Sequence, residues 1–159
     1  MAAITMGSVL PPMSVNGVRG GDNHPREVQR SDGVNPESNL HTKLLKMIHL
    51  VNIHLNHFPK HEKYGLCQQI RNCMYDIYNL VTECQKRYHK KTSLTNLDIK
   101  HEQLRMMIML AYELGYYKYK NGKKEHGQKE ESRRYLAASI LINEVGAMVG
   151  GWIKKSNLK

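Results

Sequence analysis

The sequence predicts an all-α protein, an up-down-up-down four-helix bundle preceded by a disordered N-terminal tail. From residue 40 onward, apolar residues recur at three- and four-residue steps in four separate stretches, and no stretch alternates with a period of two. Residues 1–39 lack this pattern and contain four of the five prolines and five of the twelve glycines. Such a segment buries too little apolar surface to offset its ordering entropy. We therefore expect a tail at 1–39 and a single folded domain at 40–159.

The first two helices are expected on either side of Pro59. Ser38 and Asn39 can cap the first helix, and Pro59 ends it because proline cannot continue the backbone hydrogen-bond ladder. The second helix is expected over residues 62–88. Each helix carries one apolar stripe, formed in the first by Leu40, Leu44, Met47, Ile48, Val51, Leu55 and Phe58 and in the second by Leu66, Ile70, Cys73, Met74, Ile77, Leu80, Val81, Cys84 and Tyr88.

The third and fourth helices complete the bundle. Thr95 and Asp98 form a capping-box-like start for the third helix, and Asn121-Gly122 is expected to end it. The apolar residues of these two helices are Leu97, Leu104, Ile108, Ala111 and Leu114 in the third and Leu136, Ile140, Ile142, Val145, Val149, Trp152 and Ile153 in the fourth. No single helix can bury its stripe alone, so four such helices with short connections favour a bundle.

The positive charge of the chain belongs to its folded part. The chain has 24 Lys+Arg, 14 Asp+Glu and a formal net charge of +10. The segment before residue 41 contains three arginines and four carboxylates (3 − 4 = −1), so the remainder carries 21 − 10 = +11. An excess of this size over one small domain is typical of proteins that bind a polyanion, and nucleic acid is the first candidate.

Several other function classes are excluded or disfavoured. No apolar run long enough to span a bilayer and no secretory signal is found, so we expect a cytoplasmic protein without a membrane partner. The three cysteines form no C-x-x-C pair and lie on or beside apolar stripes, which indicates buried, reduced thiols. His54, His57 and His61 have metal-like spacing, but Pro59 interrupts the helix between them, so we expect no metal and no cofactor. No catalytic motif is present.

Basic residues supply the candidate site. They cluster on and after the second helix, along the third helix and its exit, and on the fourth helix and the C-terminus. The candidates for nucleic-acid or protein contact are Arg71, Lys86, Arg87, Lys90, Lys91, Arg105, Lys118, Lys120, Lys123, Lys124, Arg133, Arg134, Lys154 and Lys155. Tyr112, Tyr116, Tyr117 and Tyr119 interleave with lysines. These tyrosines could stack on unpaired bases, or they could pack inside the bundle beside a merely solvated basic face.

Small residues near the C-terminus indicate close helix packing. Gly146, Gly150 and Gly151 lie in the fourth helix, where each costs about 1 kcal/mol relative to alanine. They would let another helix approach, either within the bundle or in a second copy of the chain. Trp152 beside them is a large apolar anchor of the kind enriched at interfaces.

Three segments resemble a known family: F-P-K-H-E-K-Y-G-L-C-Q-Q-I at 58–70, L-D-I-K-H-E-Q-L-R-M-M-I-M-L-A at 97–111 and N-E-V-G-A-M-V-G-G-W-I-K-K at 143–155. They are similar to the four-helix bundles called accessory variability determinants (Avd) of diversity-generating retroelements, a family that includes proteins encoded in intervening sequences of ribosomal RNA genes. Arg105 matches one arginine of the family's third helix, whereas Met109 stands where a second is expected.

The resemblance implies a non-catalytic protein that forms a homopentameric ring. Such a protein binds the retroelement reverse transcriptase and its template RNA, or DNA, and supports synthesis of mutated complementary DNA. A ribosomal intervening-sequence protein would share the bundle without the reverse transcriptase partner. A helical enzyme such as a ribonuclease is a third class, and it would need an acid–base pair that the sequence does not present.

Overall fold

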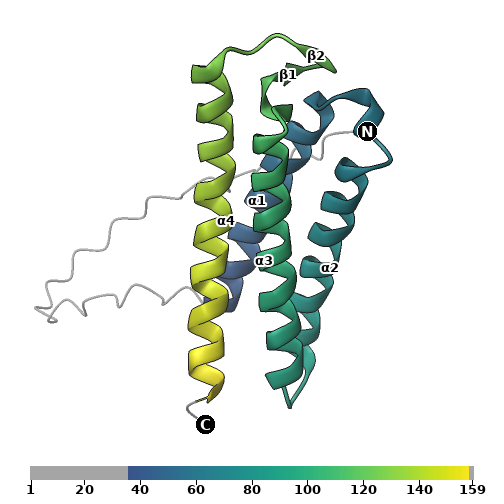
Figure 1. Ribbon diagram of the computed structural model, residues 1–159. Helices are drawn as coiled ribbons and strands as arrows, with labels where there is room; N and C mark the ends of the chain where they lie inside the picture. Colours follow the sequence, from purple (N-terminus) through teal and green to yellow (C-terminus); the bar gives the residue numbers. More distant parts are fainter. Residues whose placement is uncertain (1–35, 158–159) are drawn as a thin grey trace, which may run out of the picture. The chain divides into compact units, whose positions relative to one another are not determined.

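The computed structural model describes residues 36–157, which form a four-helix bundle (Figure 1) and confirm the predicted fold class. The long helices are α1 (Pro36–His57), α2 (Leu66–Lys86), α3 (Lys91–Glu113) and α4 (Gln128–Asn157). Two single-turn 3₁₀ helices, η1 (Lys60–Glu62) and η2 (Tyr116–Lys118), lie in the connections. Strands β1 (Tyr119–Lys120) and β2 (Lys123–Lys124) pair as an antiparallel hairpin before α4.

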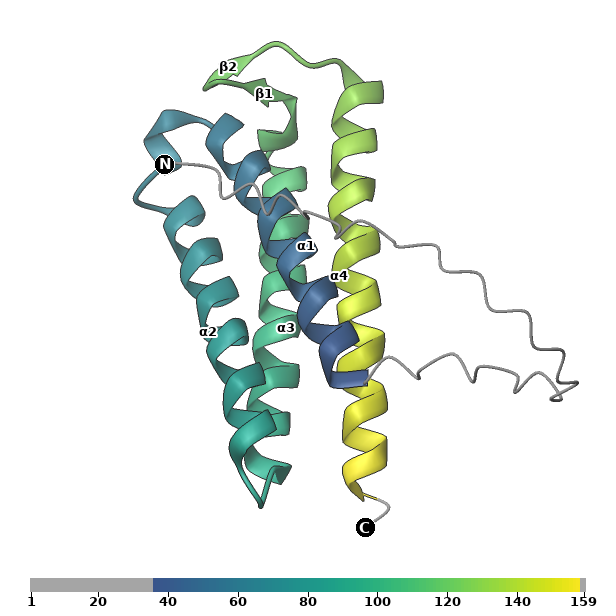
Figure 2. The ribbon, with the colours of Figure 1, turned by 180° about the vertical axis from the view of Figure 1, so that it is seen from behind.

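The connections divide the bundle into two ends. Consecutive helices run antiparallel, with α3 between α2 and α4, and α1 packed against α4 (Figures 1 and 2). One end holds the α1–α2 connection, the β-hairpin and the start of α4. The other end holds the short α2–α3 loop and the end of α4 (Figure 2). Both ends carry basic residues, which makes this division important for function.

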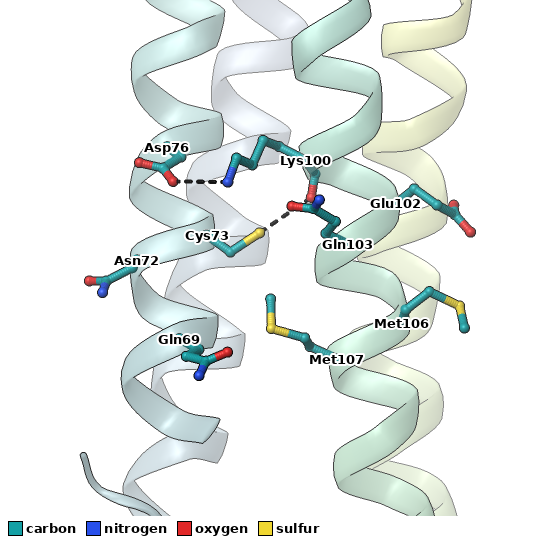
Figure 3. A pocket seen from close by; sticks show the side chains of 9 residues that line it. All are labelled: Gln69, Asn72, Cys73, Asp76, Lys100, Glu102, Gln103, Met106 and Met107. Carbon is teal, nitrogen blue, oxygen red and sulfur yellow. Dashed lines mark hydrogen bonds and ion pairs between the residues drawn. The ribbon is translucent and has the colours of Figure 1, made fainter. Parts of the chain in front are cut away.

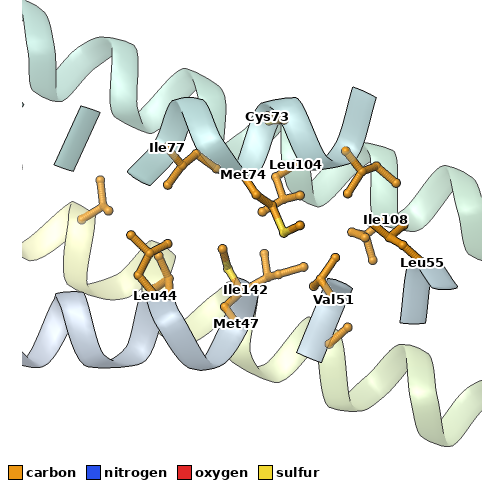
Figure 4. Packing of buried hydrophobic residues seen from close by; sticks show 14 of the residues in the cluster. Leu44, Met47, Val51, Leu55, Cys73, Met74, Ile77, Leu104, Ile108 and Ile142 are labelled. Carbon is orange, nitrogen blue, oxygen red and sulfur yellow. The ribbon is translucent and has the colours of Figure 1, made fainter. Parts of the chain in front are cut away.

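The predicted stripes meet in one core. Residues of all four helices interdigitate there, among them Leu44, Met47, Met74, Leu104 and Ile142 (Figure 4). A few predicted stripe members face outward instead, some because they lie beyond the end of α2 or α3, and others because α4 is apolar on most sides and periodicity alone does not select its buried face. The outward members are Tyr88, Leu114, Leu136 and Ile140.

Helix starts differ from the prediction. Helix α1 begins at Pro36, so residues 36–39, assigned to the tail, are helical, and proline suits a first helical position. Residues 1–35, and the tail predicted there, lie outside the described residues. Helix α3 begins at Lys91 rather than Thr95, and the Thr95 hydroxyl donates to the Lys91 carbonyl (2.9 Å) instead of capping the helix.

The β-hairpin replaces the predicted end of the third helix. Helix α3 ends at Glu113, and Gly115 takes the left-handed conformation (φ 77°) that ends many helices. Asn121 (φ 51°) and Gly122 (φ 80°) form the two-residue turn between β1 and β2. The Gly122 N–H donates to the His57 carbonyl (3.1 Å), so the turn is tied to the end of α1. Strands of two residues are too short to show alternation in the sequence.

Helix α4 is more apolar than the sequence analysis expected. By length and composition alone it could cross a membrane. Core helices of soluble proteins can have the same length and composition, and α4 packs against α1 and α3. Its Glu144 also pairs with Lys43 of α1 (2.8 Å). The apolar residues that the core does not use are exposed, as Leu136 and Ile140 show.

Candidate nucleic-acid interface

Twelve of the fourteen predicted basic residues gather at the two ends of the bundle and do not form one surface. We call the end formed by the α2–α3 loop and the last turn of α4 the loop pole, with Lys86, Arg87, Lys90, Lys91, Lys154 and Lys155. The end formed by the β-hairpin and the start of α4 is the hairpin pole, with Lys118, Lys120, Lys123, Lys124, Arg133 and Arg134. Helix α4, with 30 residues, runs between them and spans about 45 Å.

The loop pole joins segments that are far apart in the sequence. The Lys90 ammonium lies 5.6 Å from the centre of the Trp152 ring, so the loop and the end of α4 are in contact. Lys86, Lys91, Lys154 and Lys155 are exposed, and Lys90 is half-buried. Residues 86–91 and 145–159 contain no Asp or Glu. The positive charge of this pole is therefore little neutralised by its own segments.

Helix C-termini favour the positions of Lys86, Arg87, Lys154 and Lys155, whereas Lys90 and Lys91 lie at the start of α3. The Arg87 N–H donates to the Glu83 carbonyl (2.9 Å) as α2 ends, and the Arg87 side chain pairs with the Glu83 carboxylate (3.0 Å). Lys86 occupies the last turn of α2, and Lys154 and Lys155 occupy that of α4. Helix C-termini carry partial negative charge, which stabilises cations placed beside them.

Tyr88 of the loop pole is a candidate residue that the sequence analysis misplaced. It was predicted to be part of the apolar stripe of the second helix, but α2 ends two residues earlier and Tyr88 is 92% exposed. Its described ring contact is with His89, at 4.9 Å between centroids and 85° between planes. The run K-R-Y-H-K-K at 86–91 places an aromatic residue inside a basic cluster, and this pattern could have indicated Tyr88 as a candidate for nucleic-acid contact.

At the hairpin pole, carboxylates offset much of the positive charge. Lys120, Lys123 and Lys124 are exposed, and Lys118 lies 3.8 Å from the carboxylate of buried Glu131. The fold adds Lys60, Lys63 and Lys129, which the sequence analysis did not include; the first two come from the α1–α2 connection and only tertiary structure brings them here. The same end also holds Glu62, Glu125, Glu130 and Glu131.

Two arginines of the hairpin pole share one carboxylate. Arg133 Nε donates to Glu130 (2.9 Å), and Arg134 Nε donates to the same carboxylate (3.0 Å). These hydrogen bonds lower the pKa of Glu130 to about 2, so it stays charged at any ordinary pH. Arg133 and Arg134 are therefore less available to phosphate than the free lysines of the hairpin.

Arg71 and Arg105 belong to neither pole. Arg71 Nε donates to Asn52 (2.9 Å) and its terminal nitrogen donates to Asn56 (2.8 Å), so it ties α2 to α1. Arg105 Nε donates to Glu102 (3.0 Å), one turn earlier on α3. Both guanidinium groups are engaged within the bundle, and Arg71 has a structural task that its charge alone did not reveal.

The comparison with known proteins identifies the family. A family model described as bAvd-like matches residues 39–156, which is all but the tail and the last residues. The chain belongs to the bAvd-like family. No curated protein and no solved structure matches the chain. The match thus confirms the resemblance inferred from three segments, to an Avd-type accessory protein. The matched residues coincide with the bundle.

The tyrosines that interleave with lysines in this bAvd-like chain pack within it. Tyr117 is 1% exposed, and the Tyr112 ring stacks on Tyr135 with centroids 4.3 Å apart. The Tyr116 hydroxyl donates to Glu62 (2.7 Å), which raises the pKa of Tyr116 to about 12. Tyr119 is half-buried and its ring meets that of Tyr116 edge-on. Of the two interpretations left open, packing is the one the structure supports.

The glycines of the bAvd-like chain divide into two kinds. A Cβ on Gly146 would lie 2.6 Å from His101 Cε1, so this glycine makes room for the buried His101 ring of α3. His101 Nε2–H donates to the Ile142 carbonyl (2.7 Å), which fixes the ring. Gly150 and Gly151 have no neighbouring atom within 4 Å of such a Cβ. They are therefore open to an approach from outside the protomer.

The histidines with metal-like spacing have separate surroundings. His54 is buried edge-on against Tyr117, the His57 ring accepts the Asn121 N–H (3.2 Å), and His61 is exposed. Within residues 36–157 no three His, Cys, Asp or Glu side chains come together as a metal site. The cysteines are buried as predicted, and burial raises the pKa of Cys84 to about 11, which keeps this thiol protonated.

A groove between α2 and α3 is distinct from both poles. Its lining includes the side-chain amides of Gln69, Asn72 and Gln103 and the thioethers of Met106 and Met107 (Figure 3). Cys73 and the Lys100–Asp76 ion pair (3.4 Å) also line it. The Cys73 thiol donates to the Lys100 carbonyl (3.3 Å) across it. A lining with one paired lysine offers little to phosphate, so this groove is not part of the nucleic-acid interface.

Proposed function

We propose that the chain is the non-catalytic accessory protein of a diversity-generating retroelement, binding its reverse transcriptase and template RNA to support mutagenic cDNA synthesis. Family membership supports the accessory role, and the loop pole supports the RNA contact. The observation that carries the proposal is the convergence of six basic side chains from two distant segments that contain no carboxylate. Such a surface holds a polyanion without a pocket or a cofactor.

The mechanism is scaffolding by phosphate neutralisation. Each lysine or arginine that pairs with a phosphate releases condensed counterions, which drives binding at low salt. The two poles are about 45 Å apart along α4, several times the Debye length of about 8 Å at physiological salt. They therefore act as independent contacts, and an RNA that touches both is held in a fixed direction along the bundle.

Self-association completes the proposed assembly, a homopentameric ring as in the Avd proteins that the sequence resembles. Large apolar residues on the outer faces of α3 and α4 stay exposed in the single chain: Ile99, Met106, Met109, Leu110, Leu114, Leu136 and Ile140. Exposed apolar patches of this kind mark interaction surfaces. Gly150 and Gly151 on α4 have open space beside them, which suits close approach of a second copy. A ring would repeat both poles around one axis.

The proposed function fits a cytoplasmic protein. The three cysteines are free and buried, and none of the described residues needs an oxidising compartment for its structure. No cofactor is required, because a scaffold acts by binding alone. The protein's partners would be the reverse transcriptase, the template RNA and other copies of the chain.

The test is reconstitution with the reverse transcriptase and template RNA of the proposed retroelement. We expect cDNA synthesis on that template to depend on this chain and to fall when Lys86 and Lys91 are both changed to glutamate. The matched control is Lys46→Glu, a charge reversal at an exposed lysine of α1 outside both poles, which should leave synthesis unchanged. Equal cDNA synthesis with and without the chain would contradict the proposal.

A further inference from the structure

We infer that the loop pole selects unpaired RNA by stacking a base on Tyr88. This inference rests on the proposed RNA-binding function and deepens it, because it names the kind of RNA and the residue that recognises it. Four observations carry it: the exposure of Tyr88, the fixed ends of its loop, the cations around it and the contrast with other exposed tyrosines.

The exposure of Tyr88 is unusual for so large an aromatic side chain. At 92% exposed, its ring gains almost nothing from the core, whereas most tyrosines of the bundle are packed or hydrogen-bonded. The ring planes of Tyr88 and His89 are 85° apart, so His89 does not cover a Tyr88 face as a parallel stack. An aromatic face left open to solvent is what an unpaired base requires.

The backbone of the loop that carries this exposed ring is held at both ends. Residues 87–90 connect two long helices, and backbone hydrogen bonds fix both ends, from the Arg87 N–H to the Glu83 carbonyl (2.9 Å) and from the Leu94 N–H to the Lys90 carbonyl (2.8 Å). The contact between Lys90 and Trp152 adds an anchor to α4. A base that stacks here orders little chain, which lowers the entropic cost of binding.

Cations flank Tyr88 on both sides in the sequence. Lys86 and Arg87 precede it, and Lys90 and Lys91 follow His89, with no acidic residue in the run. Lysines and arginines beside an aromatic platform let the backbone of a single strand be neutralised while its base stacks. In a duplex the base faces are covered by their neighbours, so the same loop can contact only phosphates. The expected specificity is for unpaired nucleotides, without preference for a particular base.

Other exposed tyrosines lack this combination. Tyr64 is 80% exposed, but the Lys63 ammonium lies over its ring at 5.4 Å and occupies that face. Tyr75 is 52% exposed and lies in the middle of α2, away from both poles. Tyr75 therefore serves as a matched control, since its removal takes away an exposed tyrosine without touching the loop pole.

The experiment measures affinity for two RNAs by fluorescence anisotropy with the full chain. One RNA is an unstructured single-stranded oligoribonucleotide, and the other is the blunt duplex that it forms with its complement. We expect Tyr88→Ala to weaken single-strand binding about tenfold, since stacking on one aromatic ring supplies that order of affinity. Duplex binding should stay within a factor of about two, Tyr88→Phe should restore single-strand binding, and Tyr75→Ala should change neither affinity.

The outcomes separate this inference from the function on which it rests. If the unaltered protein binds neither RNA at low salt, the proposed RNA-binding function fails. If it binds both but Tyr88→Ala weakens them equally or not at all, the RNA-binding function stands and the stacking inference is wrong. Loss of reverse transcriptase capture by Tyr88→Ala with unchanged single-strand affinity would also overturn the inference, because Tyr88 would then contact protein.

Discussion

Gly146 and Gly150 lie one turn apart on α4, yet they should respond to the same substitution in opposite ways. Gly146→Ala would place a Cβ 2.6 Å from His101 Cε1, against a buried ring held by its hydrogen bond to Ile142. We expect a loss of about 1–3 kcal/mol in the free energy of unfolding, the usual cost of overpacking. Within a single protomer Gly150→Ala meets open space, and reduced chain entropy should raise the protomer's free energy of unfolding by about 0.5–1 kcal/mol.

Chemical denaturation followed by circular dichroism measures both variants. Equal effects of the two substitutions would contradict the assignment of Gly146 to helix packing within the protomer. From the sequence, the three glycines could be recognised as unusual but not told apart. The distinction depends on His101, which lies more than forty residues away in the chain and is brought to Gly146 only by the packing of α3 on α4.

His54 should make stability depend on pH. Desolvation by burial, together with the positive charges of Arg134 and Arg133 and neighbouring His57, lowers the pKa of His54 from 6.5 to about 4. The unfolded chain therefore takes up this proton first, so the stabilising contribution is complete above about pH 6.5 and is lost as pH falls toward 4. The full loss would be about 3 kcal/mol at the acid end.

Denaturation curves at several pH values test the role of His54. His54→Leu should flatten the dependence between pH 6.5 and 4, whereas His49→Leu, at an exposed histidine of the same helix, should leave it as in the unaltered protein. An unchanged slope in His54→Leu would show that another group titrates. The sequence could mark His54 as one of three spaced histidines, but its burial against Tyr117 depends on η2, an element the sequence did not predict.

At the scale of elements, Arg71 should act as a tie between helices and not as an RNA contact. Its guanidinium spans Asn52 and Asn56 on α1 from its place on α2 (2.9 and 2.8 Å). We expect Arg71→Ala to lower the free energy of unfolding by about 1–2 kcal/mol, the range for hydrogen bonds from a charged donor that is partly exposed. RNA affinity, measured under native conditions, should stay unchanged.

The opposite pattern is expected for Lys86, which lies four turns later on the same helix and is exposed without a described partner in the core. Lys86→Ala should reduce RNA affinity and leave the unfolding transition where it was. If Arg71→Ala weakened RNA binding as much as Lys86→Ala while both variants were fully folded, our assignment of Arg71 to structure and of Lys86 to binding would be wrong.

The helices themselves were predictable because each needs an apolar stripe, and the stripes of α1, α2 and α3 agree with the core in all but their ends. The connections between the helices were less predictable from the sequence. Asn121-Gly122 is a strong turn signal in any context, and local sequence does not distinguish the end of a helix from the tip of a hairpin. Only the hydrogen bond from Gly122 to His57, a contact between distant segments, shows which of the two it forms.

At the scale of the whole molecule, the exposed apolar faces of α3 and α4 predict self-association. Ile140→Glu, at a side chain that is 49% exposed on α4, should shift the protein from a ring toward monomers without unfolding it. Multi-angle light scattering gives the mass of each species. Lys46→Glu is the control, since it introduces the same residue on a face that we do not assign to the ring.

A monomer of the unaltered protein at micromolar concentration would contradict the proposed ring. The sequence shows that α4 is rich in apolar residues, but not which side of the helix the core leaves exposed. The link to ribosomal intervening-sequence proteins also stays a prediction, which the neighbourhood of the gene would test: a reverse transcriptase gene beside it favours the retroelement, and a ribosomal RNA operon favours the alternative.

The separation of positive charge into two poles is the structural result that most changes the account drawn from the sequence. The net charge of +11 after residue 40 predicted a basic surface, but periodicity could not show that its residues lie at opposite ends of α4. Several carboxylates accompany the hairpin pole, whereas segments 86–91 and 145–159 of the loop pole contain none and Arg87 pairs with Glu83, one turn earlier on α2. We therefore expect the proposed RNA binding to depend mainly on the loop pole.

The most direct test is the salt dependence of single-stranded RNA binding, compared between the unaltered protein and two triple variants. Changing Lys86, Lys91 and Lys154 to glutamine removes three charges from the loop pole, and changing Lys120, Lys123 and Lys124 removes three from the hairpin pole. At a slope of about −0.7 per neutralised phosphate, the loop-pole variant should lose about 2 from the log–log slope, and the hairpin-pole variant clearly less. Binding without salt dependence, or a larger loss in the hairpin-pole variant, would contradict the account.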